Sequence, residues 1–569
     1  MKRNGFILAA LLLAGGGFAS AQTQGGLLLD RELMTPAEMF ELSQTSFNYG
    51  SARSMAMAGA FTSLGADLSS MAINPAGLGM YRRNEISITP LMTFERSSNS
   101  ADAFGSNAKN RFTVGSFGFV INAYESTGTL TSLNIGIGYN RLADLNYSYS
   151  YQSTGNNGSI ADVFSKLLDY SGLNKNDITG DVDWNRVYPE YWGAVLGYKT
   201  GMTDQVDGRW QPTWIGSGVD IGHYTEVLSK GSVGEYEISV GANLLNKFYI
   251  GATIGIQSVH QEKHYLYGED YLYGGDGINP SLDYQLLYSH YGQGVVLDGA
   301  GVNFKLGFVY RPIENLRIGF AIHTPTYYSI ERSYVAYADA TAHVNNNVDG
   351  LKPDRDGNVY GEAVSPTLKD NGRYSWAFTS PARMLFGISY AFGNRGLISI
   401  DYERDWYNGI RIKDNPNGLY SNDAYNDTFR HTMKGSNTVR IGAEFKPLPF
   451  MAIRAGFGYT GSMLRSNGYT FNEYDRHLVT EPLTGEKVYE YNPVPASSPM
   501  TREVIYYTAG LGFSITPNVV LDVAYQYQTT KHTDYNLFYF ADGSGVNASG
   551  IYNTTFDRHA AALTLGFRF

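Results

Sequence analysis

The chain contains no cysteine, which excludes a disulfide framework and a metal site built from thiolates. It also has no excess of positive charge: the formal net charge is −10 and no basic patch occurs, which argues against nucleic acid as a partner. Past the N-terminal residues there is no run of about 18 apolar residues, so the sequence predicts no transmembrane helix. The ten histidines show no metal-ligand spacing, and no Gly-x-Ser-x-Gly motif is present. We therefore expect no catalytic residue, no metal and no cofactor.

The first residues have the pattern of an export signal. A charged start (Lys2 and Arg3) is followed by an apolar run over 6–13 and by a small-residue cleavage site that ends at Ala21. The apolar run is too short to span a bilayer. Residues 1–21 are therefore predicted to be a bacterial secretory signal rather than a buried N-terminal helix.

Three residue types are abundant: the chain has 45 Tyr, 29 Phe and 65 Gly. Together with export and the lack of cysteine, this composition indicates a β-rich protein of the cell envelope.

Alternation with a period of two is the main pattern along the chain. In MAIRAGFGYT (451–460), Met451, Ile453 and Phe457 point one way, whereas Arg454 and Gly456 point the other. A soluble β-sandwich also alternates. Here, however, the second face mixes charge with glycine, and aromatic residues often stand at the strand ends, which is typical of a membrane barrel with lipid outside and a polar lumen inside.

Fourteen segments have this pattern. The connections after even-numbered segments are short (ESTG, LNK, RPIEN, GNR, KPLP, ITPN), and those after odd-numbered segments are long. Short periplasmic turns that alternate with long external loops are the expected asymmetry of an outer-membrane barrel, and the terminal Phe569 resembles the aromatic signal of its assembly. The sequence thus predicts a 14-stranded antiparallel outer-membrane β-barrel over 84–569, with a large external insertion over about 154–234. The fourteen segments are 84–95, 111–124, 130–153, 235–246, 248–266, 299–312, 314–334, 376–392, 396–407, 437–446, 450–464, 501–514, 518–531 and 555–569.

Residues 22–83 contain no good membrane strand. Thr35 can cap a helix that Pro36 opens and Glu38 supports, and the stretch SARSMAMAGAFTSLG is built largely from small residues. Such a compact segment suits a plug that fills the barrel lumen. A soluble periplasmic extension is the alternative.

The stretch YGSARSMAMAGAFTSLGADLSSMAINPAGL (49–78) resembles the N-terminal hatch of the FadL family, although Ala58 replaces an expected glycine. The family consists of outer-membrane transporters of long-chain fatty acids and other hydrophobic compounds. The resemblance implies a 14-stranded barrel closed by a hatch over 22–83, a monomer in the outer membrane of a Gram-negative bacterium, and passive transport without catalysis. It also implies capture of the ligand outside, rearrangement of the hatch and lateral release where the third strand is kinked. The residues that carry the resemblance include Gly50, Arg53, Gly59, Asp67, Asn74, Pro75 and Ala76.

The third predicted strand changes phase near its middle. Ile135, Ile137 and Tyr139 set the lipid-facing register, and Arg141 then falls in that register. A lipid-facing arginine costs about 2–4 kcal/mol near the bilayer centre. A bulge or kink around Asn140, Arg141 and Asp144 would turn Arg141 inward. The resemblance to the FadL family implies the lateral opening there; a misplaced strand boundary is the alternative.

The 154–234 insertion is rich in large apolar side chains. It holds four of the six tryptophans and an amphipathic helix candidate, SIADVFSKLLDYSG. Two interpretations remain open: an exposed surface that captures apolar ligands, or side chains that pack on one another to hold the loop together. The candidate capture residues are Phe164, Leu167, Trp184, Trp192, Trp210 and Trp214.

Charged residues of both signs fall on the predicted lumenal face. Because opposite charges stand on neighbouring strands, we expect an ion-pair network that packs the hatch rather than a site for a ligand carboxylate. The predicted members are Lys305, Asp401, Glu403, Arg440, Glu444 and Arg454.

The sequence thus favours passive transport of hydrophobic small molecules, with outer-membrane lipid and lipopolysaccharide as surroundings. The alternative is an interaction protein that docks surface or secreted proteins through its loops. A non-specific porin is disfavoured by the plug, and the ligand itself is not identified.

Overall fold

A computed structural model describes most of the chain. The described residues are 34, 36–44, 50–99, 108–155, 158–184, 186–187, 191–214, 219–273, 284–344, 354, 358–366, 375–414, 422–423, 426, 429–430, 433–463, 469–480, 487–495, 500–534 and 552–569. The predicted signal sequence (1–21) lies outside them. Of the helices in these ranges, none has the length and apolar character that a membrane crossing requires.

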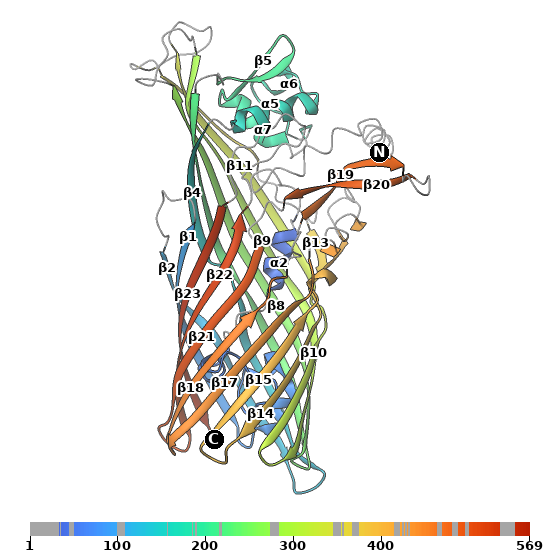
Figure 1. The fold of residues 1–569 in the computed structure, drawn as a ribbon, viewed down its shortest axis with the longest axis vertical. Helices are drawn as coiled ribbons and strands as arrows, with labels where there is room; N and C mark the ends of the chain where they lie inside the picture. The colour runs from blue at the N-terminus through green and yellow to red at the C-terminus, as the bar shows by residue number, and fades with distance from the viewer. Residues whose placement is uncertain are drawn as a thin grey trace.

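Within the described residues, fourteen antiparallel strands close into a barrel (Figure 1). The last strand pairs with the first through Ile88 and Leu565, which closes the sheet. Each of the fourteen predicted segments overlaps one strand, so the predicted fold is confirmed. In chain order the strands are β1 (Glu85–Asn99), β2 (Ala108–Glu125), β3 (Leu130–Asp144) continued by β4 (Tyr147–Gly155), β7 (Val219–Leu244), β8 (Phe248–Tyr273), β9 (Tyr284–Ile313), β10 (Leu316–His323) continued by β11 (Tyr327–Val344), β13 (Ser375–Thr379) continued by β14 (Arg383–Ala391), β15 (Gly396–Asp405) continued by β16 (Arg411–Asp414), β17 (Ser436–Leu448), β18 (Met451–Thr460), β21 (Met500–Ser514), β22 (Val519–Asp534) and β23 (Tyr552–Arg568).

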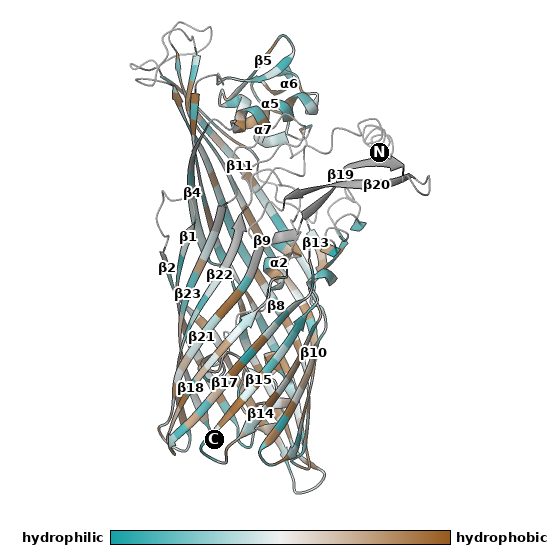
Figure 2. Ribbon diagram, in the orientation of Figure 1, coloured by the Kyte–Doolittle hydropathy of each residue, from teal (hydrophilic) through white to brown (hydrophobic). Residues whose placement is uncertain are grey.

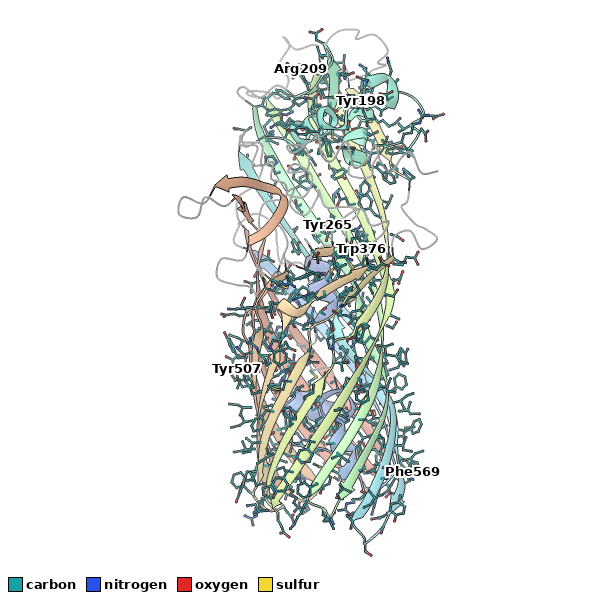
Figure 3. The ribbon with its side chains drawn as sticks, turned by 90° about the vertical axis from the view of Figure 1, so that its right-hand side faces the viewer. Tyr198, Arg209, Tyr265, Trp376, Tyr507 and Phe569 are labelled. Atoms are coloured by element: carbon teal, nitrogen blue, oxygen red, sulfur yellow. The ribbon has the colours of Figure 1, made fainter. Side chains whose placement is uncertain are left out.

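The outer face of the lower barrel is apolar. Ile453 on β18 is 44% exposed, whereas Arg454 beside it is 6% exposed, because alternate side chains point to lipid and to the lumen. Figure 2 shows apolar residues recurring along these strands. In Figure 3, Tyr507 on β21 points away from the barrel and Phe569 lies at its lower end.

On one side the wall rises far above this apolar band. Strand β9 has 30 residues, whereas a membrane crossing needs about 9–11. On β8 the outward side chains change from Ile254 and Ile256 to His260 and His264, which marks where the strand leaves the lipid. The sequence analysis placed the start of the fourth strand at 235, but β7 begins at Val219 because its upper half pairs with β8 without a lipid-facing row.

Smaller elements occupy the upper end and the lumen. The segment between β4 and β7 forms α5 (Ile160–Ser171), α6 (Lys175–Ile178), α7 (Trp192–Lys199), β5 (Thr203–Val206) and β6 (Arg209–Pro212), which lie against the tall side of the wall (Figure 1). Strand β12 (Asn358–Val364), η4 (Tyr407–Gly409) and a hairpin of β19 (Tyr469–Thr480) and β20 (Lys487–Pro495) complete the upper end. Inside the barrel lie α2 (Pro36–Ser43), α3 (Ala52–Ala56), α4 (Ser70–Ile73) and η2 (Pro75–Met80).

Candidate functional site

Residues 50–81, here named the lower hatch, fill the lumen of the lower barrel. Their backbone lies directly on the wall because the wall presents glycine toward them. A Cβ at Gly442 would lie 2.6 Å from the carbonyl oxygen of Met57, and one at Gly319 would overlap the backbone of Thr62. Several of these glycines pair directly across neighbouring strands, as Gly442 does with Gly456. We name these wall glycines that face the lower hatch the glycine belt; they are Gly241, Gly251, Gly307, Gly319, Gly387, Gly442, Gly456 and Gly510.

Asn74 is a central anchor of the lower hatch. Its side chain is fully buried; Nδ2 donates to the carbonyl of Thr62 at 2.6 Å, and Oδ1 accepts from the backbone N–H of Ala76 at 3.1 Å. Pro75 follows as the first residue of η2, a position that needs no N–H donor. The Asn-Pro-Ala triplet therefore fixes a sharp change of direction inside the lumen.

The other predicted hatch residues act within the same segment. The carboxylate of Asp67 accepts hydrogen bonds from the hydroxyl of Ser51 at 2.7 Å and from the backbone N–H of Ser69 at 2.9 Å. Gly50 leaves room for Ser69, and Gly59 has a φ of 70°, which glycine adopts without strain. These contacts join the start of the lower hatch to its middle.

Side chains of the wall hold the lower hatch from several strands. The carboxylate of Asp401 on β15 accepts from the backbone N–H of Thr62 at 2.7 Å. From β21, the hydroxyl of Thr508 donates to the carbonyl of Ala56 at 2.9 Å. On β10, Nε2 of His323 lies 2.9 Å from the carbonyl oxygen of Ile73. The hatch backbone thus has partners all round the lumen.

The predicted lumenal charges divide into separate groups. Glu403 lies between Arg440, at 2.5 Å, and Arg383, a partner that the sequence analysis missed. Lower down, Arg454 bridges Glu444 at 2.7 Å and Asp522 at 2.5 Å. Five of these six residues are buried, and the side chain of the sixth, Arg383, is 17% exposed. Their charges are paired with one another, as expected for a network that packs the lumen.

Lys305 belongs to a third group on the other side of the barrel. Its ammonium pairs with Glu235 and, at 2.8 Å, with Glu237. Both carboxylates are fully buried, and Asn140 donates to Glu237 at 2.5 Å. The two glutamates were missed because they lie at inward positions of a strand whose register could not be fixed from sequence.

Helix α2 forms a second layer in the lumen, above the lower hatch (Figure 1). Glu41 pairs with Lys263 at 2.5 Å, and Glu38 lies 3.4 Å from Arg332. Phe40 packs against Tyr407, with their ring centroids 5.1 Å apart. Ion pairs and packing therefore hold α2 to the wall on opposite sides.

The wall is interrupted beside the third strand. Among the described residues, the ladder between β2 and β3 ends at the pair Ser116–Asn140, and 108–114 of β2 pair only with β1. The register of β3 against β7 shifts between Arg141 and Ala143. Arg141 is 7% exposed and donates to Thr113 at 3.0 Å, so its charge does not face lipid.

Beyond this shift the chain turns toward the lumen. Ser97 on β1 donates to the carbonyl of Ser148 at 2.6 Å, and Arg141 lies 3.6 Å from Asp144. A small cavity of about 50 Å³ joins the shift to the lower hatch; Asn140 and Arg141 line it together with Ile73 and His323. The interruption of the wall and the hatch thus share one space.

The insertion does not present the exposed surface that we considered for ligand capture. Five of the six candidate side chains are at most 9% exposed, and Trp184 is partly buried on the same core. Phe164 packs edge-on against Tyr291 of the wall, and Trp184 against Trp192. The correction follows from the tall wall, whose inner face gives these apolar side chains a surface to cover. Figure 3 shows Tyr198 and Arg209 of the insertion at the upper end of the molecule. The buried candidates are Phe164, Leu167, Trp192, Trp210 and Trp214.

The start of α5 is a polar junction within this core. Ser159 caps the helix, and its hydroxyl donates to Glu269 on β8 at 2.6 Å. Asp162 completes the capping box by accepting from the backbone N–H of Ser159 at 2.9 Å. Burial, with the nearby charge of Glu269, raises the pKa of Asp162 to about 6.

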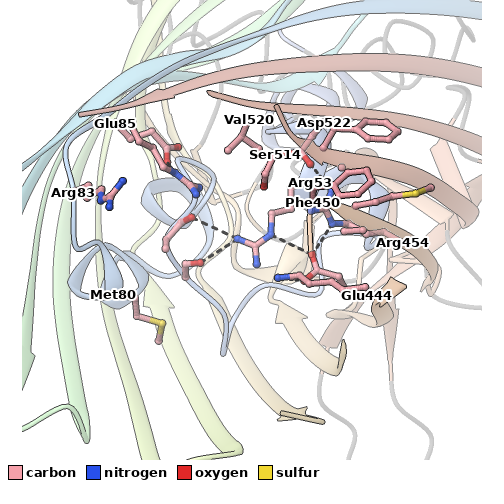
Figure 4. A pocket seen from close by; sticks show the side chains of 18 of the residues that line it. Arg53, Met80, Arg83, Glu85, Glu444, Phe450, Arg454, Ser514, Val520 and Asp522 are labelled. Atoms are coloured by element: carbon pink, nitrogen blue, oxygen red, sulfur yellow. Dashed lines mark hydrogen bonds and ion pairs between the residues drawn. The ribbon is translucent and has the colours of Figure 1, made fainter. Parts of the chain in front are cut away.

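A larger cavity of about 460 Å³ opens below the lower hatch (Figure 4). Residues of the hatch, among them Arg53 and Met80, form its roof, and strand ends form its sides. Seven of its lining residues are basic and three are acidic. Within the described ranges, no group of three or more metal-ligating side chains occurs here or elsewhere.

No protein-family model matches the chain, and no curated protein matches it in sequence. Solved structures do match. A Pseudomonas aeruginosa FadL homologue is 12% identical, with 91% of this chain and 98% of that chain covered and a TM-score of 0.50. The toluene transporters TodX of P. putida (13% identity, 91% and 98% covered, TM-score 0.45) and TbuX of Ralstonia pickettii (14%, 93% and 100%, TM-score 0.44) also match. The first match establishes a shared fold, so the FadL-like barrel that the N-terminal sequence indicated is confirmed.

Proposed function

We propose that this protein is a passive outer-membrane transporter of hydrophobic small molecules, a class that includes long-chain fatty acids. The observation that carries the proposal is the filled lumen: a compact hatch sits on a belt of wall glycines that leave it just enough room. A non-specific porin has a water-filled channel instead. The fold shared with a FadL homologue supports the same conclusion.

The proposed path leaves the barrel sideways. The ligand enters from outside the cell, the hatch rearranges, and the ligand reaches the membrane where β2 loses its pairing with β3. Asn140, Arg141 and the shift that follows them support this exit, because the cavity beside them touches the hatch. An apolar ligand that leaves through the wall avoids the periplasmic water, which is the physical reason for such a route.

Mass spectrometry of organic extracts tests the proposal directly. The protein is purified from its native outer membrane as the parent and as the Asn74→Ala and Pro75→Ala variants. We expect a defined hydrophobic molecule in the parent and a changed occupancy in the variants. Asn518→Ala, on an exposed turn, is the matched control and keeps the parent's occupancy.

A second measurement addresses the exit. Cells that carry a bulky pair of residues at Thr113 and Leu142 should take up a radiolabelled fatty acid or toluene more slowly than parent cells. An empty lumen in all variants, together with a co-purifying surface protein, would instead support the docking alternative.

A further inference from the structure

The cavity below the lower hatch has unused positive charge. Each of its acidic residues has a close basic partner: Glu85 with Arg568 at 2.7 Å, Glu444 with Arg454 at 2.7 Å, and Asp522 with the same Arg454 at 2.5 Å. Two arginines thus account for all three carboxylates. The other basic residues, Arg53 and Arg317 among them, bring the lining to an excess of four positive charges.

Of the lining cations that are not exposed, Arg317 and Arg53 have the least satisfied donors, although the guanidinium of Arg53 also lies 5.3 Å from the ring centroid of Phe61. Arg317, half-buried near the start of β10, makes no hydrogen bond or ion pair with any described residue. Arg53 reaches Glu444 only at 3.6 Å and the carbonyls of Gly65 and Ala66 at 3.4 and 3.5 Å, near the limit of a hydrogen bond. Both guanidinium groups line the same cavity. Enclosed like charges of this kind favour an anion between them.

The volume of the cavity also suits a small-molecule ligand. A volume of about 460 Å³ falls within the range of about 300–1,000 Å³ that is usual for small-molecule sites. Guanidinium groups bind phosphate through two parallel N–H donors, and two such groups here face one space. Lys446, 3.5 Å from Glu444, adds a further charge at the rim.

We propose that this cavity binds a small phosphate-bearing anion from the periplasmic side, held between Arg53 of the hatch and Arg317 of the wall. Such an anion joins the hatch to the barrel, since it shares its oxygens between the two. The phosphate is supplied either by a soluble molecule or by the head group of an inner-leaflet phospholipid. Binding itself does not depend on what the barrel transports.

The test is a calorimetric titration of the full-length protein in neutral detergent with inorganic pyrophosphate. We expect saturable binding of one pyrophosphate per barrel. Arg317→Gln should weaken it at least tenfold without changing the thermal unfolding temperature, because Arg317 has no partner to lose. Arg395→Gln, at an exposed turn of the same end but outside the cavity lining, should bind within twofold of the parent. Lys446→Gln, a second cavity variant, should weaken binding several-fold.

Measurements in lipid nanodiscs identify the source of the phosphate. Pyrophosphate affinity in neutral detergent is compared with that in nanodiscs of phosphatidylcholine alone and of phosphatidylcholine with phosphatidylglycerol. Equal affinity in all three indicates a soluble anion. A loss of affinity in either nanodisc relative to detergent indicates that a phospholipid head group occupies the cavity. The proposal is overturned if the parent shows no saturable binding, or if Arg317→Gln binds like the parent. Neither result would change the outcome of the extraction experiment, so the two proposals fail independently.

Discussion

Asn74 of the hatch and Gly307 of β9 occupy one space: a Cβ on residue 307 would overlap Oδ1 of Asn74. The hatch therefore seats against β9 only while that position is glycine. We expect Gly307→Ala to displace the hatch and raise the ion conductance of single barrels in planar bilayers several-fold. Gly566→Ala is the matched control, because a Cβ there meets its nearest atom at 3.9 Å. Equal conductance of the two variants would contradict this account of the glycine belt.

Asn74 itself should hold the hatch closed. Asn74→Ala removes the donor to the carbonyl of Thr62 and the acceptor for the N–H of Ala76, and leaves both groups buried. An unpaired buried polar group costs about 1–3 kcal/mol. We expect cells with this variant to become more sensitive to vancomycin, a large polar antibiotic that an intact hatch excludes. Unchanged sensitivity at equal barrel abundance would show that the hatch does not depend on this anchor.

Glu403 should contribute strongly to barrel stability. Glu403→Gln removes the carboxylate that Arg383 and Arg440 share, and leaves Arg383 with Asp405 alone, at 2.9 Å. Breaking a buried ion pair from one side costs about 3–5 kcal/mol. We expect a clearly lower unfolding temperature in detergent, measured by circular dichroism. Glu262→Gln, at an exposed position above the lipid band, should leave that temperature unchanged.

The insertion should unfold locally while the barrel stays folded. Phe164 is fully buried against Tyr291 and fills the space that Gly197 leaves free. Phe164→Ala removes about 3–5 kcal/mol of packing. We expect faster hydrogen exchange in α5 and α7 and unchanged exchange in β17 and β18, since local units open separately. Faster exchange throughout the barrel would mean that the insertion and the barrel form one cooperative unit.

The docking of α5 should depend on pH. The pKa of Asp162 is raised to about 6 in the folded protein, above its value of about 4 in an unfolded chain. Between these values the folded state binds the proton more tightly, so the stability of this region should fall as pH rises from about 4 to 6 and then stay level. Amide-exchange protection of α5 over this range measures the effect. Asp162→Asn, which keeps an oxygen for the N–H of Ser159, should flatten the profile.

Most of the barrel could be predicted from sequence because lipid imposes a strict rule on each strand. Side chains that face lipid, such as Ile453 and Phe457, must be apolar, and a charged side chain such as Arg454 must face the lumen. The number and order of the strands follow from this pattern. The short periplasmic turns and the small-residue stretch around Asn74 were recognisable for the same reason: each needs particular residues locally.

Lipid does not constrain the upper half of the tall side of the wall, so the sequence did not predict how it packs. Above the lipid band, the outward positions of β8 hold histidine and charge, and its inward positions hold tyrosines that pack on the insertion. Only the tertiary structure decides that three of the four tryptophans of the insertion are buried and the fourth partly buried, because part of the surface that they pack on comes from strands distant in sequence.

By itself, the sequence determined the strands, their faces and the identity of the segment that plugs the lumen, since each depends on local periodicity. The tertiary structure alone decided which charges meet, where the wall is interrupted, and that the wall glycines face the hatch. Those relationships depend on register across the sheet, and a shift of one residue would turn every side chain to the opposite face.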